Sequence, residues 1–149
     1  LHLASVGDTR AVLARGGGAV RLTSDHTAAL PAEKERVLDA GGLVARGRVQ
    51  GIIAVTRALG DCELRPWVTS EPQVSALRRR RGGGEEGEVL VLASDGLWSC
   101  MEDEEAARLA ASHAHPQQAA EALLAEVERR GGRDNISVVV ARWGDEPPS

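Results

Sequence analysis

The chain of 149 residues contains no phenylalanine and no tyrosine, and only three tryptophans. With so few aromatic rings, its core has to be built from valine, leucine, isoleucine and alanine. The same shortage argues against a single-stranded nucleic-acid binder, because such proteins stack bases on aromatic side chains. The net charge of −4 offers no general attraction for a phosphate backbone either. We therefore expect no nucleic-acid partner.

Cysteine and long apolar runs are also scarce. Cys62 and Cys100 are the only cysteines, and we expect free thiols in a reducing intracellular compartment, whether cytoplasmic, nuclear or organellar. No apolar stretch approaches the roughly 20 residues that a membrane-spanning helix needs, so no membrane contact is expected. No signal peptide is visible. The chain opens at Leu1 in the middle of a strand pattern, which suggests a fragment whose targeting segment would not be seen.

The rest of the composition is that of one globular domain, with 42% hydrophobic and 27% charged residues. Helices are expected over 31–40, 102–112 and 116–130, because proline or acidic residues open them and glycine pairs end the first and the last. Strand patterns cover 1–6, 10–15, 19–22, 43–45, 49, 52–56, 74–77, 89–93 and 136–143. Because a turn is expected at 7–9, the strand at 10–15 is predicted to run back along 1–6. The elements are mostly strands, followed by two helices and a last strand. This order predicts an α+β fold with helices packed on a sheet.

Two polar stretches are interpreted as ordinary surface. The basic run 78–81 leads into three glycines and two glutamates. This low complexity, with opposite charges nearby, favours a solvated loop over a binding patch. Residues 144–149 are interpreted as a tail.

The most informative residues are aspartates at the ends of apolar runs. A carboxylate at a rigid strand end, beside a glycine that leaves room for a ligand, is well placed to bind a hard cation. Any one of them could equally be a turn residue, because Asp-Gly, Asp-Asn and Gly-Asp-Thr are all typical of turns. Several together suggest a shared metal site. The residues concerned are Asp8, Asp61, Asp95 and Asp134.

A series of short motifs then follows in a fixed order along nearly the whole chain. They are Val6-Gly7-Asp8-Thr9-Arg10, Leu22-Thr23-Ser24-Asp25-His26, Glu33-Lys34-Glu35-Arg36-Val37, Ala40-Gly41-Gly42, Ala54-Val55-Thr56-Arg57-Ala58-Leu59-Gly60-Asp61, Glu71-Pro72, Ala93-Ser94-Asp95-Gly96-Leu97-Trp98 and Arg133-Asp134-Asn135-Ile136-Ser137. Any one of these motifs is weak, but their order is specific. The chain resembles the C-terminal part of the catalytic domain of PP2C-type (PPM family) metal-dependent Ser/Thr protein phosphatases.

This resemblance implies a β-sandwich flanked by helices, truncated here at its N-terminus. Residues 1–143 would belong to the phosphatase domain, and 25–51 would form the flap beside the active site. The implied cofactors are two Mg²⁺ or Mn²⁺ ions and, in many members, a weaker third. The implied reaction is hydrolysis of a phosphoserine or phosphothreonine protein by a metal-activated water, in agreement with the oxygen ligands that such ions prefer. We expect a monomer.

The resemblance also assigns roles to single residues. Asp95 matches a ligand of the metal pair, Asp134 matches a late ligand of the catalytic metal, and Asp8 matches a ligand of the third metal. Asp61 belongs to a motif that braces the flap. Ser99 stands where many members have a further aspartate, and serine is a much poorer ligand for a hard cation than a carboxylate.

Histidines and arginine are given structural roles. For His26 a flap role is favoured over acid–base catalysis, and Arg57 is expected to brace the fold rather than to grip phosphate. The other histidines are not spaced in the sequence as metal ligands are, and we expect them at the surface. They are His2, His113 and His115. Which residues bind substrate is not indicated.

The resemblance leaves two hypotheses open. The family's Asp-Gly-His-Gly motif, further acidic ligands and a phosphate-binding arginine are absent from the chain, so the chain alone is expected to be inactive although its full-length parent is an enzyme. The alternative is a pseudophosphatase or truncated isoform that acts as a binding module. A stand-alone cation-binding domain is less favoured, because a few carboxylates alone make an open, weak site.

Overall fold

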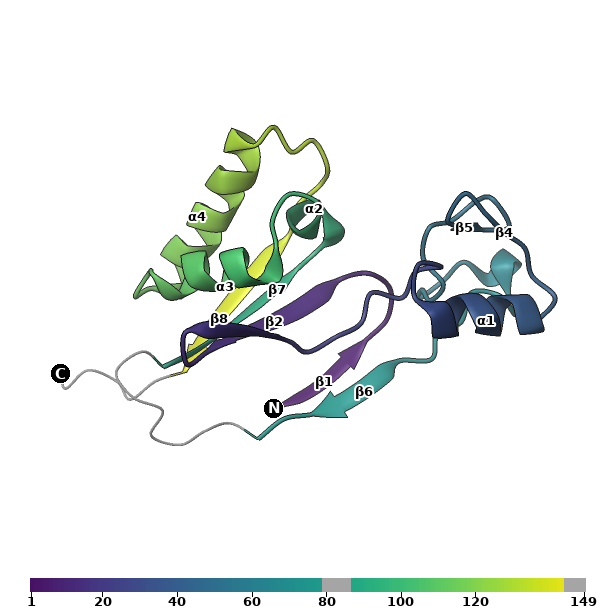
Figure 1. Cartoon of the computed structure of the whole chain (residues 1–149), viewed down its shortest axis with the longest axis horizontal. Coiled ribbons are helices and arrows are strands. Elements are labelled where there is room, and N and C mark those ends of the chain that lie inside the picture. Colours follow the sequence, from purple (N-terminus) through teal and green to yellow (C-terminus); the bar gives the residue numbers. More distant parts are fainter. Residues whose placement is uncertain (79–86, 144–149) are drawn as a thin grey trace. The chain divides into compact units, whose positions relative to one another are not determined.

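The computed structural model describes residues 1–78 and 87–143 of the chain (Figure 1). Most of the basic run at 78–81 and the tail at 144–149 lie outside these residues. The chain divides into two compact units. The first unit comprises Leu1, Arg10–Thr23 and Leu77–Ser149, and the second comprises His2–Thr9 and Ser24–Ala76. Within 1–78 and 87–143, every helix is too short or too polar to cross a bilayer.

The first unit is built on a four-stranded antiparallel sheet in the order β3-β2-β7-β8. Helices α3 and α4 pack against it, α3 on β2, β3 and β7 and α4 on β8 (Figure 1). The short helix α2 follows β7 directly. The bounds are β2 Arg10–Arg15, β3 Gly18–Arg21, β7 Glu88–Ala93, α2 Asp95–Trp98, α3 Asp103–Ala111, α4 Pro116–Arg129 and β8 Val138–Trp143.

The core of this unit is aliphatic, as the composition predicts. Alternate residues of β2 and β7 meet the apolar faces of α3 and α4, so one side of the sheet is packed with small and branched side chains. Leu123 and Leu97 are fully buried at its centre, and burying such a side chain contributes about 1.5–3 kcal/mol. The strand residues concerned are Val12, Ala14, Val89, Val91 and Ala93.

Local signals set the ends of the two long helices. α3 begins with a run of three acidic residues, which favour the positive end of the helix dipole. α4 begins at Pro116, and the Nδ1 atom of His115 accepts a hydrogen bond of 3.3 Å from the Gln117 N–H. It ends at Arg129, two residues before Gly131, whose φ of 77° suits glycine. The predicted helices 102–112 and 116–130 are confirmed. His115 is exposed, but His113 is half-buried rather than at the surface, because its ring contacts the Leu109 carbonyl at 3.0 Å.

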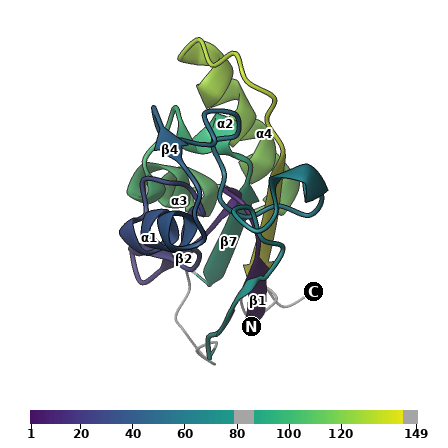
Figure 2. The same cartoon turned by 90° about the vertical axis from the view of Figure 1, so that its right-hand side faces the viewer.

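The second unit combines a two-stranded antiparallel sheet with a small helical lobe. β1 (His2–Ser5) pairs with β6 (Gln73–Ala76). α1 (Pro31–Asp39) packs beside β4 (Val44–Ala45) (Figure 2). β4 pairs with β5 (Arg48–Val49). A 3₁₀ helix, η1, covers Cys62–Leu64. The fully buried centre of the lobe is Val37, Val49 and Val68. The helix predicted over 31–40 is confirmed.

Two strand predictions were wrong. The strand at 10–15 does not return along 1–6, because β2 pairs with β3 and β7 while β1 pairs with β6. All four inner residues of β2 are buried, as is typical of a strand inside a sheet, whereas β1 alternates between exposed and half-buried residues. Residues 52–56 form only isolated bridges, Val49 to Ile53 and Thr27 to Val55, because a tight turn with positive φ at Gln50 and Gly51 precedes them.

Candidate metal centre

Asp95 is the first residue of α2 and follows directly on the end of β7. Its side chain is exposed. The sequence predicts a strand end with a glycine beyond it, and it misses the helical turn that forms there. The sequence feature that could have indicated this helix is Ser94, because serine is a preferred residue type at the position just before a helix.

Asp134 lies in the loop between α4 and β8 and is also exposed. Its Oδ1 atom accepts a hydrogen bond of 2.8 Å from the N–H of Asn135. Three hydrogen bonds fasten this loop to the residue before Asp95. The Ser94 N–H donates to the Ser137 carbonyl at 3.1 Å, the Ser137 N–H donates to the Ser94 Oγ at 3.1 Å, and the Ser94 hydroxyl donates to the Asn135 carbonyl at 3.3 Å.

Gly96 allows the two segments to touch. A Cβ atom at this position would lie 2.5 Å from the Asn135 carbonyl oxygen and 3.0 Å from the Ile136 side chain. Any larger residue would force the segments apart. The fold therefore brings the residues beside two aspartates, far apart in the sequence, into backbone contact at neighbouring strand ends.

The donors in this place suit a hard cation. Mg²⁺ is commonly held by one or two carboxylates while it keeps several waters, and Asp95 and Asp134 are both exposed carboxylates that can accept such a role. Among the residues that the structure describes, no three His, Cys, Asp or Glu side chains gather to hold a metal ion. What these residues offer is an open set of donors that fits a partly hydrated ion.

Two further residues that the resemblance links to a metal have different settings. Asp8 is half-buried in the second unit, beside Gly7, whose carbonyl accepts a hydrogen bond of 2.9 Å from the His26 N–H. Its role as a ligand stays a prediction. Ser99 is exposed at the end of α2, and its hydroxyl donates to the Gly96 carbonyl at 3.2 Å.

Comparison with known proteins decides the family. The sequence pattern described as Protein phosphatase 2C matches residues 1–136. The chain belongs to the protein phosphatase 2C family. It is 42% identical over 145 residues to probable protein phosphatase 2C 74 of Oryza sativa subsp. japonica, covering 94% of the chain and 36% of that protein. It is 39% identical over 140 residues to protein phosphatase 2C homolog 1 of Saccharomyces cerevisiae, covering 94% and 48%.

Solved structures confirm the mixed α+β, PP2C-like fold. A C. elegans sex determining protein matches with a TM-score of 0.81 and 26% identity, over 95% of this chain and 36% of that one. A phosphatase from a pathogenic strain of Toxoplasma gondii matches with a TM-score of 0.79 and 28% identity, over 93% and 46%. This protein phosphatase 2C chain thus spans between a third and a half of the length of each of these four proteins.

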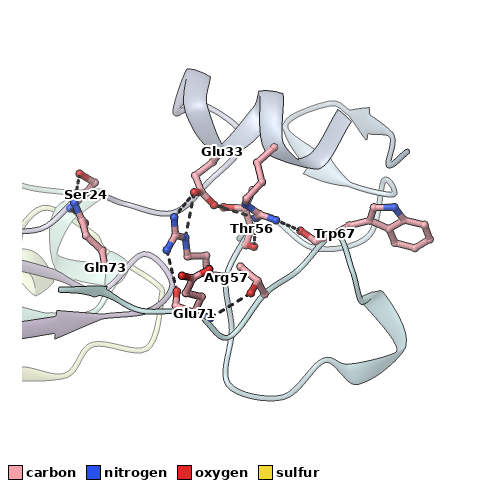
Figure 3. A network of polar contacts seen from close by, with 9 residues as sticks. Ser24, Glu33, Thr56, Arg57, Trp67, Glu71 and Gln73 are labelled. Carbon is pink, nitrogen blue, oxygen red and sulfur yellow. Dashed lines mark hydrogen bonds and ion pairs between the residues drawn. The ribbon is translucent and has the colours of Figure 1, made fainter. Parts of the chain in front are cut away.

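In the second unit of this phosphatase 2C chain, a cluster of polar side chains surrounds the buried carboxylate of Glu33 (Figure 3). Glu33, on α1, is 3% exposed. It accepts hydrogen bonds from Arg57 at 2.6 and 3.1 Å, from the Thr56 hydroxyl at 2.7 Å and from Arg36 at 3.1 Å. Burial raises the pKa of Glu33, but these donors outweigh it and lower the pKa to about 2. The carboxylate therefore stays charged in the folded chain.

The cluster fastens α1 to the segments that follow it. The Nη1 atom of Arg57 donates to the Glu71 carbonyl at 2.9 Å, and Arg36 donates to the carbonyls of Thr56 at 2.8 Å and Trp67 at 3.1 Å. The prediction that Arg57 braces the fold is confirmed. The sequence assigns Glu33 only to the helix dipole and misses its buried role. The signal that could have revealed it is Arg36, one helical turn later.

His26 and Asp61 are two further predicted residues of the second unit. His26 is 1% exposed, and its burial, followed by the charge of Arg57, lowers its pKa. This supports a structural role. Asp61 does not brace the flap through its side chain, because within the described residues its exposed carboxylate has no hydrogen-bond partner. It contributes its backbone carbonyl, which accepts from the Leu64 N–H at 2.9 Å.

Proposed function

We propose that this chain is part of a Mg²⁺- or Mn²⁺-dependent protein Ser/Thr phosphatase in which Asp95 and Asp134 are metal ligands. The observation that carries the proposal is the backbone contact between Gly96 and Asn135. In a chain of the protein phosphatase 2C family, this contact joins the segments of two aspartates that are suited to a hard cation.

The chemistry follows from the donors. A bound pair of Mg²⁺ or Mn²⁺ ions supplies an activated water for hydrolysis of phosphoserine and phosphothreonine esters. The part of this chain is to present oxygen ligands from rigid positions. Asp95 is anchored by β7, and Asp134 lies in the loop that leads into β8, the neighbouring strand of the same sheet. Asp8 is proposed as a ligand of a weaker third ion.

The limits of the phosphatase domain are also proposed. The chain spans 36% of the rice relative and 48% of the yeast relative, and we propose that catalysis draws on residues beyond those compared. We assign 1–143 to the phosphatase domain and 25–51 to the flap, which includes α1, β4 and β5. A phosphorylated protein is the proposed substrate.

A calorimetric titration of the purified chain with Mn²⁺ tests the metal assignment. Asp95→Asn and Asp134→Asn each remove one carboxylate charge, and each is expected to weaken binding at least about tenfold. Asp61→Asn is the matched control, because it removes an exposed aspartate charge elsewhere. Isotherms of the two ligand variants identical to wild type would contradict the assignment.

A second test addresses the reaction. The full-length protein that contains this chain is expected to hydrolyse a phosphothreonine peptide with Mn²⁺, and Asp134→Asn is expected to abolish turnover. Turnover unaffected by this change would refute the assignment of Asp134. Retained Mn²⁺ binding with no hydrolysis by the wild type would instead favour the binding-module alternative.

A further inference from the structure

The helix that carries Asp95 is fastened at its far end by Trp98. The indole N–H of Trp98 donates to the carbonyl of Ala93 at 2.9 Å, so the single turn of α2 is folded back onto the last residue of β7. The guanidinium carbon of Arg10 lies 5.0 Å from the centre of the Trp98 ring, a distance at which a cation is attracted to an aromatic face.

Arg10 is itself held in place by a buried ion pair. It lies directly opposite Ala93 in the β2–β7 register. Its Nη1 atom is 2.6 Å from Oδ1 of Asp103, the first residue of α3, and the two side chains are only 11% and 12% exposed. Arg21 on β3 contacts the same carboxylate at 2.6 and 3.1 Å. Burial raises the pKa of Asp103, but Arg21 and Arg10 together lower it, so the pair remains ionised.

We propose that Arg10, Trp98 and Asp103 form a positioning cluster that orients Asp95 for metal binding without touching the metal. The inference rests on the proposed function. A helix of four residues has no stability of its own, so α2 keeps its place only through its contacts. The cluster fixes its last residue, and the contact of Gly96 with Asn135 fixes its middle. Asp95 lies between Ala93, whose carbonyl accepts from the Trp98 indole, and Gly96, so its backbone has little freedom.

The same two strands provide a matched control. At the opposite ends of β2 and β7, the Nε atom of Arg15 lies 2.6 Å from Oε1 of Glu88, with side chains 16% and 6% exposed. This ion pair resembles that of Arg10 and Asp103 in length and burial. It does not contact α2. Loss of either pair should lower the stability of the sheet, but only the loss of Asp103 should loosen Asp95.

The experiment compares Mn²⁺ binding by calorimetry and thermal unfolding for Asp103→Asn, Trp98→Phe and Glu88→Gln in the 149-residue chain. All titrations are made well below each unfolding midpoint. Asp103→Asn and Trp98→Phe are expected to raise the Mn²⁺ dissociation constant about tenfold or more, as the loss of supporting residues around metal ligands does. Glu88→Gln is expected to lower the unfolding midpoint and leave the dissociation constant at the wild-type value. Trp98→Phe keeps an aromatic ring and so provides a milder change if Asp103→Asn does not fold.

The outcomes separate this inference from the proposed function. A wild-type dissociation constant in folded Trp98→Phe and Asp103→Asn would overturn the positioning role, as would an equal weakening by Glu88→Gln, since affinity would then simply follow stability. Absence of Mn²⁺ binding by the wild type, or binding that Asp95→Asn does not change, would overturn the proposed metal site, and the positioning role with it.

Discussion

At two positions, the contacts of a single residue connect distant segments of the chain. Gly96 follows Asp95 because there is no room for a Cβ beside the Asn135 carbonyl. Glu33 remains charged in the interior because four hydrogen bonds from three side chains replace its water. In both cases one residue connects segments that are distant in the sequence, so its replacement should have effects beyond its own position.

Gly96→Ala should destabilise the chain and weaken its metal site. Its Cβ would have to push the Asn135 carbonyl away, and such overpacking costs about 1–3 kcal/mol. Gly18→Ala is the control, because its Cβ would meet nothing closer than 4.0 Å. Urea unfolding and Mn²⁺ titration of both variants provide the measurement. Equal stability of the two variants would show that the contact is looser than described.

Glu33→Gln should give a loss of stability that depends on pH. The folded pKa of Glu33 is about 2, below its ordinary value of 4.5. A lowered pKa means that the charged form stabilises the fold above the unfolded pKa, and this contribution disappears as pH falls toward the folded pKa. At neutral pH the shift corresponds to at most about 3 kcal/mol.

Urea unfolding of wild type and Glu33→Gln across this range is the test. The difference in unfolding free energy should be constant above about pH 5.5 and should shrink steadily between 4.5 and about 2. Glu35→Gln, an exposed change on the same helix, is the control and should show no such dependence. A difference that grows on acidification would have the wrong sign for a carboxylate stabilised by arginines.

At the scale of elements, α4 is held to the first unit by its apolar face. Ala119, Leu123 and Val127 recur at intervals of four residues and are all buried. They pack against the strands and α3 in the same aliphatic core. Since isolated helices of this length are marginal in water, this face rather than helix propensity keeps α4 in place.

Leu123→Ala should therefore cost about 2–5 kcal/mol, the usual range for truncating a buried leucine. Leu123 is 0% exposed, whereas Leu38, on α1, is 47% exposed. Leu38→Ala is the matched control and should change stability far less. Both losses of stability would be measured from the denaturant concentration at the unfolding midpoint, provided that the dependence of the unfolding free energy on denaturant is unchanged. A small effect of Leu123→Ala would mean that neighbouring side chains collapse into the space.

At the scale of the molecule, the two units divide the predicted ligands. Asp95 and Asp134 belong to the first unit and Asp8 to the second. The described residues provide carboxylates but no group of three metal-binding side chains. A dinuclear centre needs more donors than these, because a Mg²⁺ ion takes an octahedron of about six oxygen ligands and waters supply only part of it.

The 149-residue chain alone is accordingly expected to be inactive as a phosphatase and to bind Mn²⁺ only weakly. Hydrolysis of a phosphothreonine peptide at saturating Mn²⁺ is the assay, with the full-length protein as comparison. Metal-dependent turnover by the chain alone, lost in Asp134→Asn, would contradict the expectation and would mean that these residues suffice for catalysis.

The sequence by itself determined the three longer helices, the aliphatic core and the family. Helix signals are local: Pro31, Pro116 and the glycines that follow each act within about one turn. The predominance of valine, leucine and alanine in the core follows from the absence of phenylalanine and tyrosine. The order of the motifs was sufficient to identify the family, and two of them contain the candidate ligands Asp95 and Asp134.

Only the tertiary structure decided which strands pair and which polar residues meet. The pairing of β1 with β6 joins residues about 70 positions apart, and no short-range pattern encodes such a choice, because strand register depends on packing of whole faces. The burial of Glu33, the contact of Gly96 with Asn135 and the Arg10–Asp103 pair depend in the same way on distant partners. The burial of a charge and the close approach of two backbones are properties of the folded chain, since they exist only when both partners are in place.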